Sequence, residues 1–130
     1  MKLNFIKAQD IDRNAKATIH QSGKLGFSSD AANKLGLAGG VKGIIIAMNE
    51  DRADENLYIK VMEGISEAAF TLIKAGDYYY VNAKAFFDTY DIDYRNNKIV
   101  YDILNFTYEG EAMFKFLKRE LKKKQISEGN

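Results

Sequence analysis

The residue best suited to acid–base chemistry is His20, because it is the only histidine in the chain. A histidine that acts as a general base needs a nucleophile within hydrogen-bond reach and a carboxylate that orients its ring. No such set follows from the spacing of the residues around His20. Its neighbours Ala17 and Ile19 predict an apolar face in this strand, which places His20 on the polar side. We therefore favour a surface histidine over a catalytic base.

Metal sites and phosphate-binding loops are equally difficult to assemble from this sequence. With no cysteine and one histidine, disulfides, thiolate sites and multi-histidine sites within one chain are excluded. Asp88, Asp91 and Asp93 resemble a fragment of a calcium loop, but they lack its ligand spacing and its glycine. The glycines between 36 and 43 follow a predicted helix and precede a strand, whereas a dinucleotide loop has the reverse order. We expect no metal, no cofactor and no enzymatic activity.

Two segments contain residue types that nucleic-acid-binding proteins use. Tyr78, Tyr79 and Tyr80 offer rings on which bases could stack, although in a strand Tyr78 and Tyr80 share one face and Tyr79 lies on the other. No lysine or arginine is interleaved with these tyrosines, so packing within the sheet is the favoured interpretation. The window from Lys118 to Lys124 is the most basic, and a solvated terminal segment is favoured there over a contact to DNA or RNA.

The composition is that of a small globular protein. Of its 130 residues 46% are hydrophobic, and 19 basic and 18 acidic residues leave a net charge of +1. This balance confines any basic patch to one local surface. The N-terminal residues lack the apolar run of a signal peptide, and the longest apolar run, 43–48, is too short to cross a membrane. We expect a cytoplasmic protein without a membrane partner.

Alternating apolar residues and turn signals predict strands that are interrupted by two short helices. Ser28 is suited to cap the first helix, and Gly36 suits the left-handed position that ends it. Asn82 is expected to cap the second helix. The predicted strands lie at 2–7, 15–20, 25–27, 43–48 and 57–61 in the first half, and at 70–73, 78–81, 99–103 and 113–117 in the second half.

The two halves repeat one order of elements. At a constant spacing of 53 residues, Gly23 aligns with Gly76, Leu25 with Tyr78 and Phe27 with Tyr80. We therefore predict a mainly β (α+β) fold in which two ββαββ repeats form one pseudo-twofold barrel with two short helices. The single domain, 1–130, divides into a first repeat with an N-terminal strand (1–63), a second repeat (67–120) and a tail (121–130).

The segment from Ala17 to Leu37 resembles the swapped-hairpin module of the AbrB, SpoVT and MraZ type. It has a strand, a Ser22-Gly23 turn, a second strand and a helix that ends in Leu35-Gly36-Leu37, followed by the glycine-containing turn 39–43 and an apolar strand. The match covers about residues 15–48 and, more faintly, 68–103. In that family two modules interlock into one barrel, and the MraZ branch carries both modules in one chain.

This resemblance implies a transcription-regulatory protein that binds double-stranded DNA through basic residues of the first hairpin. The positions carried over to this chain are Arg13, Lys16, His20 and Lys24. In the second repeat Asp77 stands where the first has Lys24, so the two turns would bind phosphate unequally. The near-neutral net charge supports a second hypothesis, a scaffold or assembly subunit that associates with itself or with another protein and binds no nucleic acid.

Overall fold

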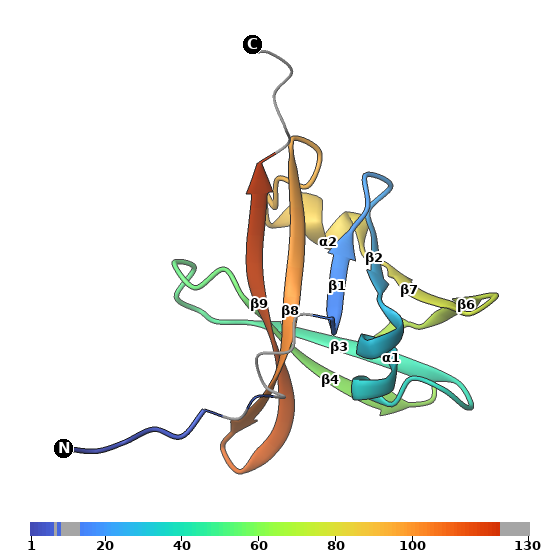
Figure 1. The fold of residues 1–130 in the computed structure, drawn as a ribbon. Helices are drawn as coiled ribbons and strands as arrows, with labels where there is room; N and C mark the ends of the chain where they lie inside the picture. The colour runs from blue at the N-terminus through green and yellow to red at the C-terminus, as the bar shows by residue number, and fades with distance from the viewer. Residues whose placement is uncertain (7, 9–13, 123–130) are drawn as a thin grey trace.

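The computed structural model describes residues 1–6, 8 and 14–122, and this part of the chain forms nine strands and two helices (Figure 1). The predicted mainly β fold with two short helices is confirmed. The elements, in chain order, are β1 (Lys16–Ile19), β2 (Lys24–Phe27), α1 (Ser29–Leu35), β3 (Lys42–Met48), β4 (Leu57–Glu63), β5 (Phe70–Thr71), β6 (Ile73–Ala75), β7 (Tyr78–Asn82), α2 (Lys84–Thr89), β8 (Asn97–Tyr108) and β9 (Glu111–Lys122).

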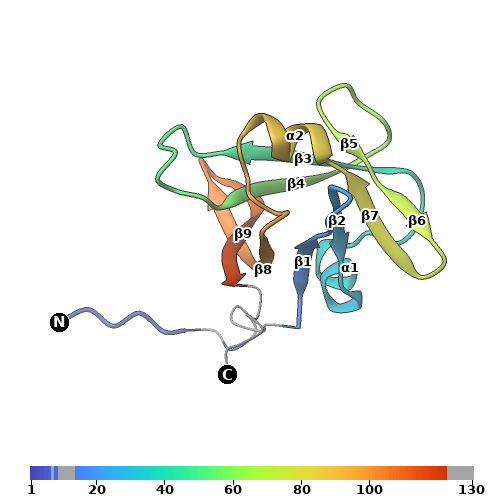
Figure 2. The same ribbon diagram turned by 90° about the horizontal axis from the view of Figure 1, so that it is seen from above.

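The strands form one antiparallel sheet that nearly closes into a barrel (Figure 2). Their order in the sheet is β5-β3-β4-β9-β8-β1-β2-β7-β6. The two edge strands, β5 and β6, are separated in the chain by Leu72 alone, and β5 pairs with β3 while β6 pairs with β7. The amide of Leu72 donates to the carbonyl oxygen of Lys42 at 3.0 Å. The edges of the sheet therefore meet at Leu72, which limits the unpaired backbone that an open sheet exposes.

The interior of the barrel is filled by the inward-facing residues of each strand. In β1, for example, Ala17 and Ile19 are buried while Lys16 points to solvent, as the alternation predicts. The hydrophobic effect of burying these side chains is the main stabilising contribution to the fold. The largest fully buried side chains are Tyr94, Tyr101, Phe87, Phe116, Leu25, Leu37, Ile44, Leu57, Ile59, Ile99, Ile103 and Val81.

Helix α1 begins and ends at the residues that the sequence predicts. The Ser28 hydroxyl accepts from the amide of Ala31 at 3.2 Å, and Gly36 ends the helix in the left-handed conformation with φ 67°. Ala31, Ala32 and Leu35 bury the inner face of the helix against the barrel. The same Ser28 hydroxyl accepts from the amide of Lys16 at 3.0 Å, so one side chain joins the helix cap to β1.

Helix α2 begins differently from the prediction. Its N-cap residue is Ala83, without a side-chain hydrogen bond, and Asn82 instead ends β7 as the partner of Lys24. The predicted Asn82 cap is therefore wrong, because pairing with β2 holds Asn82 in the sheet. The start of α2 packs against the β1–β2 turn, where a Cβ atom added to Gly23 would lie 2.3 Å from the Cβ of Lys84.

Three predicted boundaries also differ from the structure. Residues 1–6 form no strand, and their apolar side chains find no place in the barrel, with Leu3 70% and Phe5 83% exposed. The predicted strand 70–73 is divided at Leu72, where the chain passes from pairing with β3 to pairing with β7. Strand β9 continues to Lys122, so the first residues of the basic window belong to the sheet.

Candidate functional site

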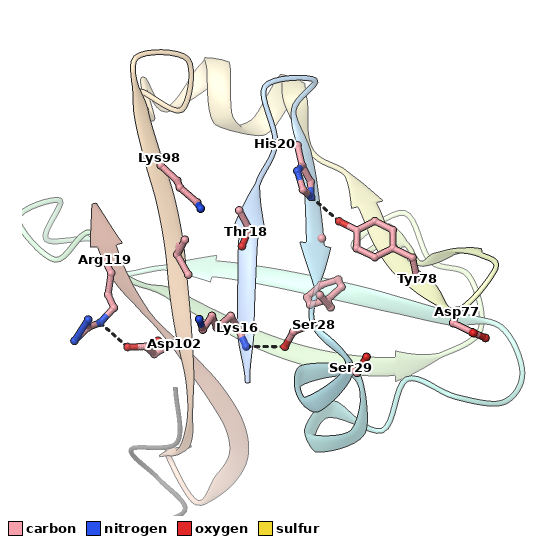
Figure 3. Close-up of a pocket in the computed structure, with 13 residues that line it drawn as sticks. Lys16, Thr18, His20, Ser28, Ser29, Asp77, Tyr78, Lys98, Asp102 and Arg119 are labelled. Carbon is pink, nitrogen blue, oxygen red and sulfur yellow. Dashed lines mark hydrogen bonds and ion pairs between the residues drawn. The ribbon is translucent and has the colours of Figure 1, made fainter. Parts of the chain in front are cut away.

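An open groove of about 930 Å³ lies on the outer face of the sheet, across β9, β8, β1, β2 and the start of β7 (Figure 3). Gly26 and Val100 are buried in its floor, and polar side chains surround them. The residues that line the groove are Lys16, Thr18, His20, Gly26, Phe27, Ser28, Ser29, Asp77, Tyr78, Lys98, Val100, Asp102 and Arg119.

Strand register explains why residues distant in sequence share this groove. Directly paired residues of neighbouring strands point to the same face of a sheet. Lys16 is paired with Asp102, and Thr18 with both Val100 and Gly26. The residues that alternate with them face the barrel interior. The groove therefore lies on the outer face of the same strands whose inner face packs into the core.

The structure brings together three of the four predicted site residues. Lys16 and His20 line the groove. Lys24 lies beside the groove on the same face of the hairpin, with its ammonium nitrogen 4.6 Å from the centre of the Tyr80 ring. Arg13 lies outside the described residues. The first hairpin thus presents its cationic side chains on one face.

Two further cations of the groove, Lys98 and Arg119, were not predicted as site residues. Lys98 comes from β8 and Arg119 from β9, and they join the hairpin because β1 pairs with β8 and β8 pairs with β9. Arg119 lies within the basic window 118–124, for which a solvated terminal segment was the favoured interpretation. The sequence signal was present there, but the strand that positions it was not predicted to extend so far.

One of the two carboxylates in the groove is compensated. Arg119 donates through Nε to Oδ2 of Asp102 at 2.6 Å, and the Asp102 carboxylate is buried in the floor. This charge-assisted bond neutralises Asp102 and fixes the guanidinium of Arg119 at the groove. Among the described residues, Lys16 and Lys98 form no ion pair. Asp77 contributes the remaining carboxylate at the rim.

An aromatic cluster closes one end of the groove. The Tyr78 hydroxyl and Nε2 of His20 share a hydrogen bond of 2.5 Å (Figure 3). The Tyr78 ring stacks on that of Tyr80, with centres 6.0 Å apart and planes inclined by 27°. The hydroxyl occupies the space above Gly26, where an added Cβ would lie 1.6 Å from it. Burial raises the pKa of Tyr78, so its hydroxyl stays protonated at neutral pH.

Strand pairing brings a lysine and the histidine to the tyrosines, which the sequence of their own strand does not show. Within the strand no lysine or arginine is interleaved, but pairing with β2 places Lys24 over Tyr80 and His20 against Tyr78. Tyr78 and Tyr80 do share one face, as predicted, while Tyr79 packs against the core.

The acidic segment that resembles a calcium loop has a different role in the structure. Asp88 accepts hydrogen bonds from Lys84 at 2.8 Å and from the Tyr94 hydroxyl at 2.9 Å, and it pairs with Arg95 at 3.1 Å. These interactions, led by the bond from Lys84, lower the pKa of Asp88 to about 2. Asp93 instead accepts from the amide of Asn96 at 3.2 Å. Asp88 and Asp93 therefore fasten the connection between α2 and β8.

Comparison with known proteins adds no assignment to the site. Family models, curated proteins and solved structures contain no match to this chain. In the described part of the chain, no group of three or more histidine, aspartate or glutamate side chains is placed to hold a metal ion. Across residues 1–6, 8 and 14–122, no helix combines the length and the apolar character needed to span a membrane.

Proposed function

We propose that this protein binds nucleic acid and holds the phosphodiester backbone along the groove. The observation that carries the proposal is the arrangement of its cations. Lys16, Lys98 and Arg119 come from three adjacent strands and line one groove, and Lys24 from a fourth strand adjoins it. Lysine and arginine side chains supply most of the affinity of nucleic-acid-binding proteins by neutralising phosphates.

The cationic side chains of the groove are better suited to phosphate groups than to carboxylates in an arbitrary arrangement. The Arg119 guanidinium is fixed by Asp102 in the floor, and arginine presents paired donors that fit phosphate oxygens. Lys16 and Lys98 line the same groove from β1 and β8, and a lysine ammonium is a compact point charge on a flexible stem. A linear polyanion that crosses the strands would meet each of these cations in turn.

The organisation of the sheet supports the predicted likeness to swapped-hairpin DNA-binding proteins. The β1–β2 hairpin lies between β8 and β7, both from the second half of the chain. The β6–β7 hairpin pairs with β2 of the first half on one side, and on its other side β6 is an edge strand that Leu72 connects to β5, the partner of β3. Each hairpin thus pairs with at least one strand of the other half, which agrees with the interlocked modules of that family.

We also propose that the two halves are ββαββ repeats related by a pseudo-twofold axis. When β5, which has no counterpart, is left out, the order of the strands around the nearly closed barrel stays the same if β1, β2, β3 and β4 are exchanged with β6, β7, β8 and β9. The pairing of β1 with β8 then corresponds to the adjoining edges β6 and β3. Burial corrects the predicted alignment by one position. The buried Leu25 and Phe27 correspond to the inward-facing Tyr79 and Val81, and not to Tyr78 and Tyr80, which share the opposite face. An experimental structure in which the two units superpose over all matching elements would support the repeat. Units that superpose over only one hairpin would contradict it.

Fluorescence anisotropy with labelled oligonucleotides of mixed sequence tests nucleic-acid binding directly. We expect binding at low ionic strength that weakens as salt rises, because cations condensed on the phosphates are released on binding. The double variant Lys16→Ala/Lys98→Ala removes two phosphate contacts, which should flatten the plot of log K against log salt by about 1.4 for a single strand. The charge-matched control is Lys60→Ala/Lys74→Ala, on β4 and β6 away from the groove.

Two results would overturn this proposal. The first is the absence of binding to single-stranded or duplex DNA and to RNA at low ionic strength. The second is a groove variant that keeps the affinity and salt dependence of the native protein while the control pair loses them.

A second candidate function, an assembly subunit, is favoured by the N-terminal segment. Leu3 and Phe5 alternate with polar residues, and their side chains are almost fully exposed in an extended chain. Exposed apolar side chains in a row are typical of interaction sites. Sedimentation velocity should then detect self-association that Leu3→Ser/Phe5→Ser abolishes. A native protein that stays monomeric at all concentrations would count against self-association through this segment.

A further inference from the structure

We infer that the nucleic acid bound in the groove is single-stranded and that Tyr78 stacks on one of its bases. This inference rests on the proposed function and specifies its ligand. It follows from the way in which Tyr78 is held at the end of the groove.

The orientation of Tyr78 is unusual for a surface tyrosine. Tyr78 is 38% exposed as a residue, yet its hydroxyl is hydrogen-bonded to His20 above Gly26. Most surface tyrosines keep the hydroxyl in water and bury the ring. Here the hydroxyl is engaged within the protein, and part of the ring is left to line the groove.

Two contacts and the space above Gly26 fix the position of the Tyr78 ring before any ligand binds. The hydrogen bond to His20 fixes its tip, the Tyr80 ring supports it by stacking, and the missing side chain of Gly26 provides the space beneath it. A ring that is already ordered loses little conformational entropy when a ligand stacks on it. The cluster therefore has the properties of a preorganised stacking platform.

The cations place a nucleic-acid backbone in a position to use this platform. Lys16 and His20 belong to the same outward side of the hairpin, and Lys24 contacts the face of Tyr80. A strand whose phosphates lie over Lys98, Arg119 and Lys16 would reach Tyr78 at the end of the groove (Figure 3).

The platform favours single strands over a duplex. Proteins that bind single strands combine a cationic groove with aromatic rings on which unpaired bases stack, and every base has a face suited to this contact. In a duplex the base faces are already stacked on one another, so a ring on a sheet surface can reach only the backbone or the groove edges. An aromatic ring fixed beside the cations thus adds affinity for unpaired bases.

The inference is tested by the affinities of three DNA ligands of equal length: a mixed-sequence single strand, its duplex, and an abasic strand with the same number of phosphates. We expect the native protein to bind the single strand about tenfold more tightly than the abasic strand, since one stacked base contributes roughly a factor of 5 to 150. Tyr78→Leu should lose this factor for the single strand and leave the abasic strand unaffected, while Tyr78→Phe should keep most of it.

Two further variants separate stacking from damage to the fold. Tyr108→Leu removes an exposed tyrosine at the end of β8, outside the groove, and should bind as the native protein does. Gly26→Val places a side chain where the Tyr78 hydroxyl and Nε2 of His20 lie, and should reproduce the loss of Tyr78→Leu for the single strand while every lysine and arginine of the groove is kept. Melting temperatures of all variants verify that they are folded.

The possible failures are distinguishable. Equal, salt-dependent affinity for the single and abasic strands would overturn base stacking and leave the proposed function standing. Tighter binding of the duplex would overturn the single-strand assignment in the same way. No binding of any of the three ligands, nor of RNA, would overturn the proposed function and this inference together.

Discussion

Replacing Tyr101 by phenylalanine should make the protein more stable. Tyr101 lies on the inward side of β8 with its side chain completely buried, and its hydroxyl oxygen has no hydrogen-bond partner among the described residues. Burial raises the pKa of Tyr101 far above its ordinary value, so the hydroxyl remains neutral and protonated. In the unfolded chain the same hydroxyl is hydrated. Folding therefore removes it from water without replacing the lost hydrogen bond.

The expected gain follows from the burial of this one group. An unsatisfied buried hydroxyl costs about 1–3 kcal/mol, and phenylalanine removes it while keeping the ring contact with Phe116, whose centre lies 6.1 Å from that of Tyr101. The small space that the oxygen leaves reduces the benefit, so we expect a rise in unfolding free energy of about 1–2 kcal/mol. For a chain of this length, that corresponds to an increase in melting temperature of about 3–8 °C.

Thermal and urea unfolding followed by circular dichroism measure this change. The urea midpoint should rise while the slope m stays constant, because the surface exposed on unfolding is nearly the same. Tyr94→Phe is the matched control with the opposite sign, since the Tyr94 hydroxyl donates to Asp88 at 2.9 Å and its loss should lower the melting temperature. A Tyr101→Phe protein that melts below the native one would refute the reasoning, because the hydroxyl would then make a net stabilising interaction.

Three other changes test the interactions that position the site. Asp88→Asn should reduce the stability of the fold at neutral pH. Folding lowers the pKa of Asp88 from 3.8 to about 2, so the stability that the ionised carboxylate contributes is present above pH 4 and is lost as the pH falls toward 2. Urea midpoints across this range should therefore converge for the two proteins, and a gap that stays constant would argue against the ionised carboxylate as the cause. Ser28→Ala removes the cap of α1 and the bond to the amide of Lys16, and should lower the unfolding free energy by about 1–2 kcal/mol; a loss below a few tenths would mean that water replaces both bonds. Gly26→Ala should displace the Tyr78 ring, and the shift of the His20 ring signals in NMR spectra would report it; an unchanged spectrum would contradict the contact at Gly26.

Those parts of the fold that depend on neighbouring residues could be predicted from the sequence. The Ser28 cap, the left-handed Gly36 and the alternation of β1 and β2 each depend on residues within a few positions of one another, and they were found as expected. The Asn82 cap failed because a distant partner, Lys24 of β2, determines the conformation of this residue. Likewise the alternating N-terminal residues look like a strand, but no strand among the described residues pairs with them.

The candidate site shows the same division between local and distant information. Lys16, His20 and Lys24 were proposed from the family resemblance, and local alternation places only His20 on the polar side of its strand. Lys98 and Arg119 join them only through the pairing of β1 with β8 and of β8 with β9. The partnership of Tyr78 with His20 likewise depends on the pairing of β2 with β7. No periodicity within a single segment contains that information, because register between distant strands is set by the packing of the whole barrel.

The position of the β1–β2 hairpin between β7 and β8 has a consequence for the biosynthesis of the chain. Ribosomes add about 5–20 residues per second, so the hairpin leaves the ribosome several seconds before the strands that flank it in the sheet. The β2 edge of the hairpin stays open until β7 has been synthesised, and the β1 edge stays open until Asp102, the partner of Lys16, has been synthesised. The barrel can close only once β9 is also available. The same strands of a second chain offer identical partners during this interval. Refolding at high concentration should therefore yield dimers that have exchanged their hairpins, and dilution should return them to monomers.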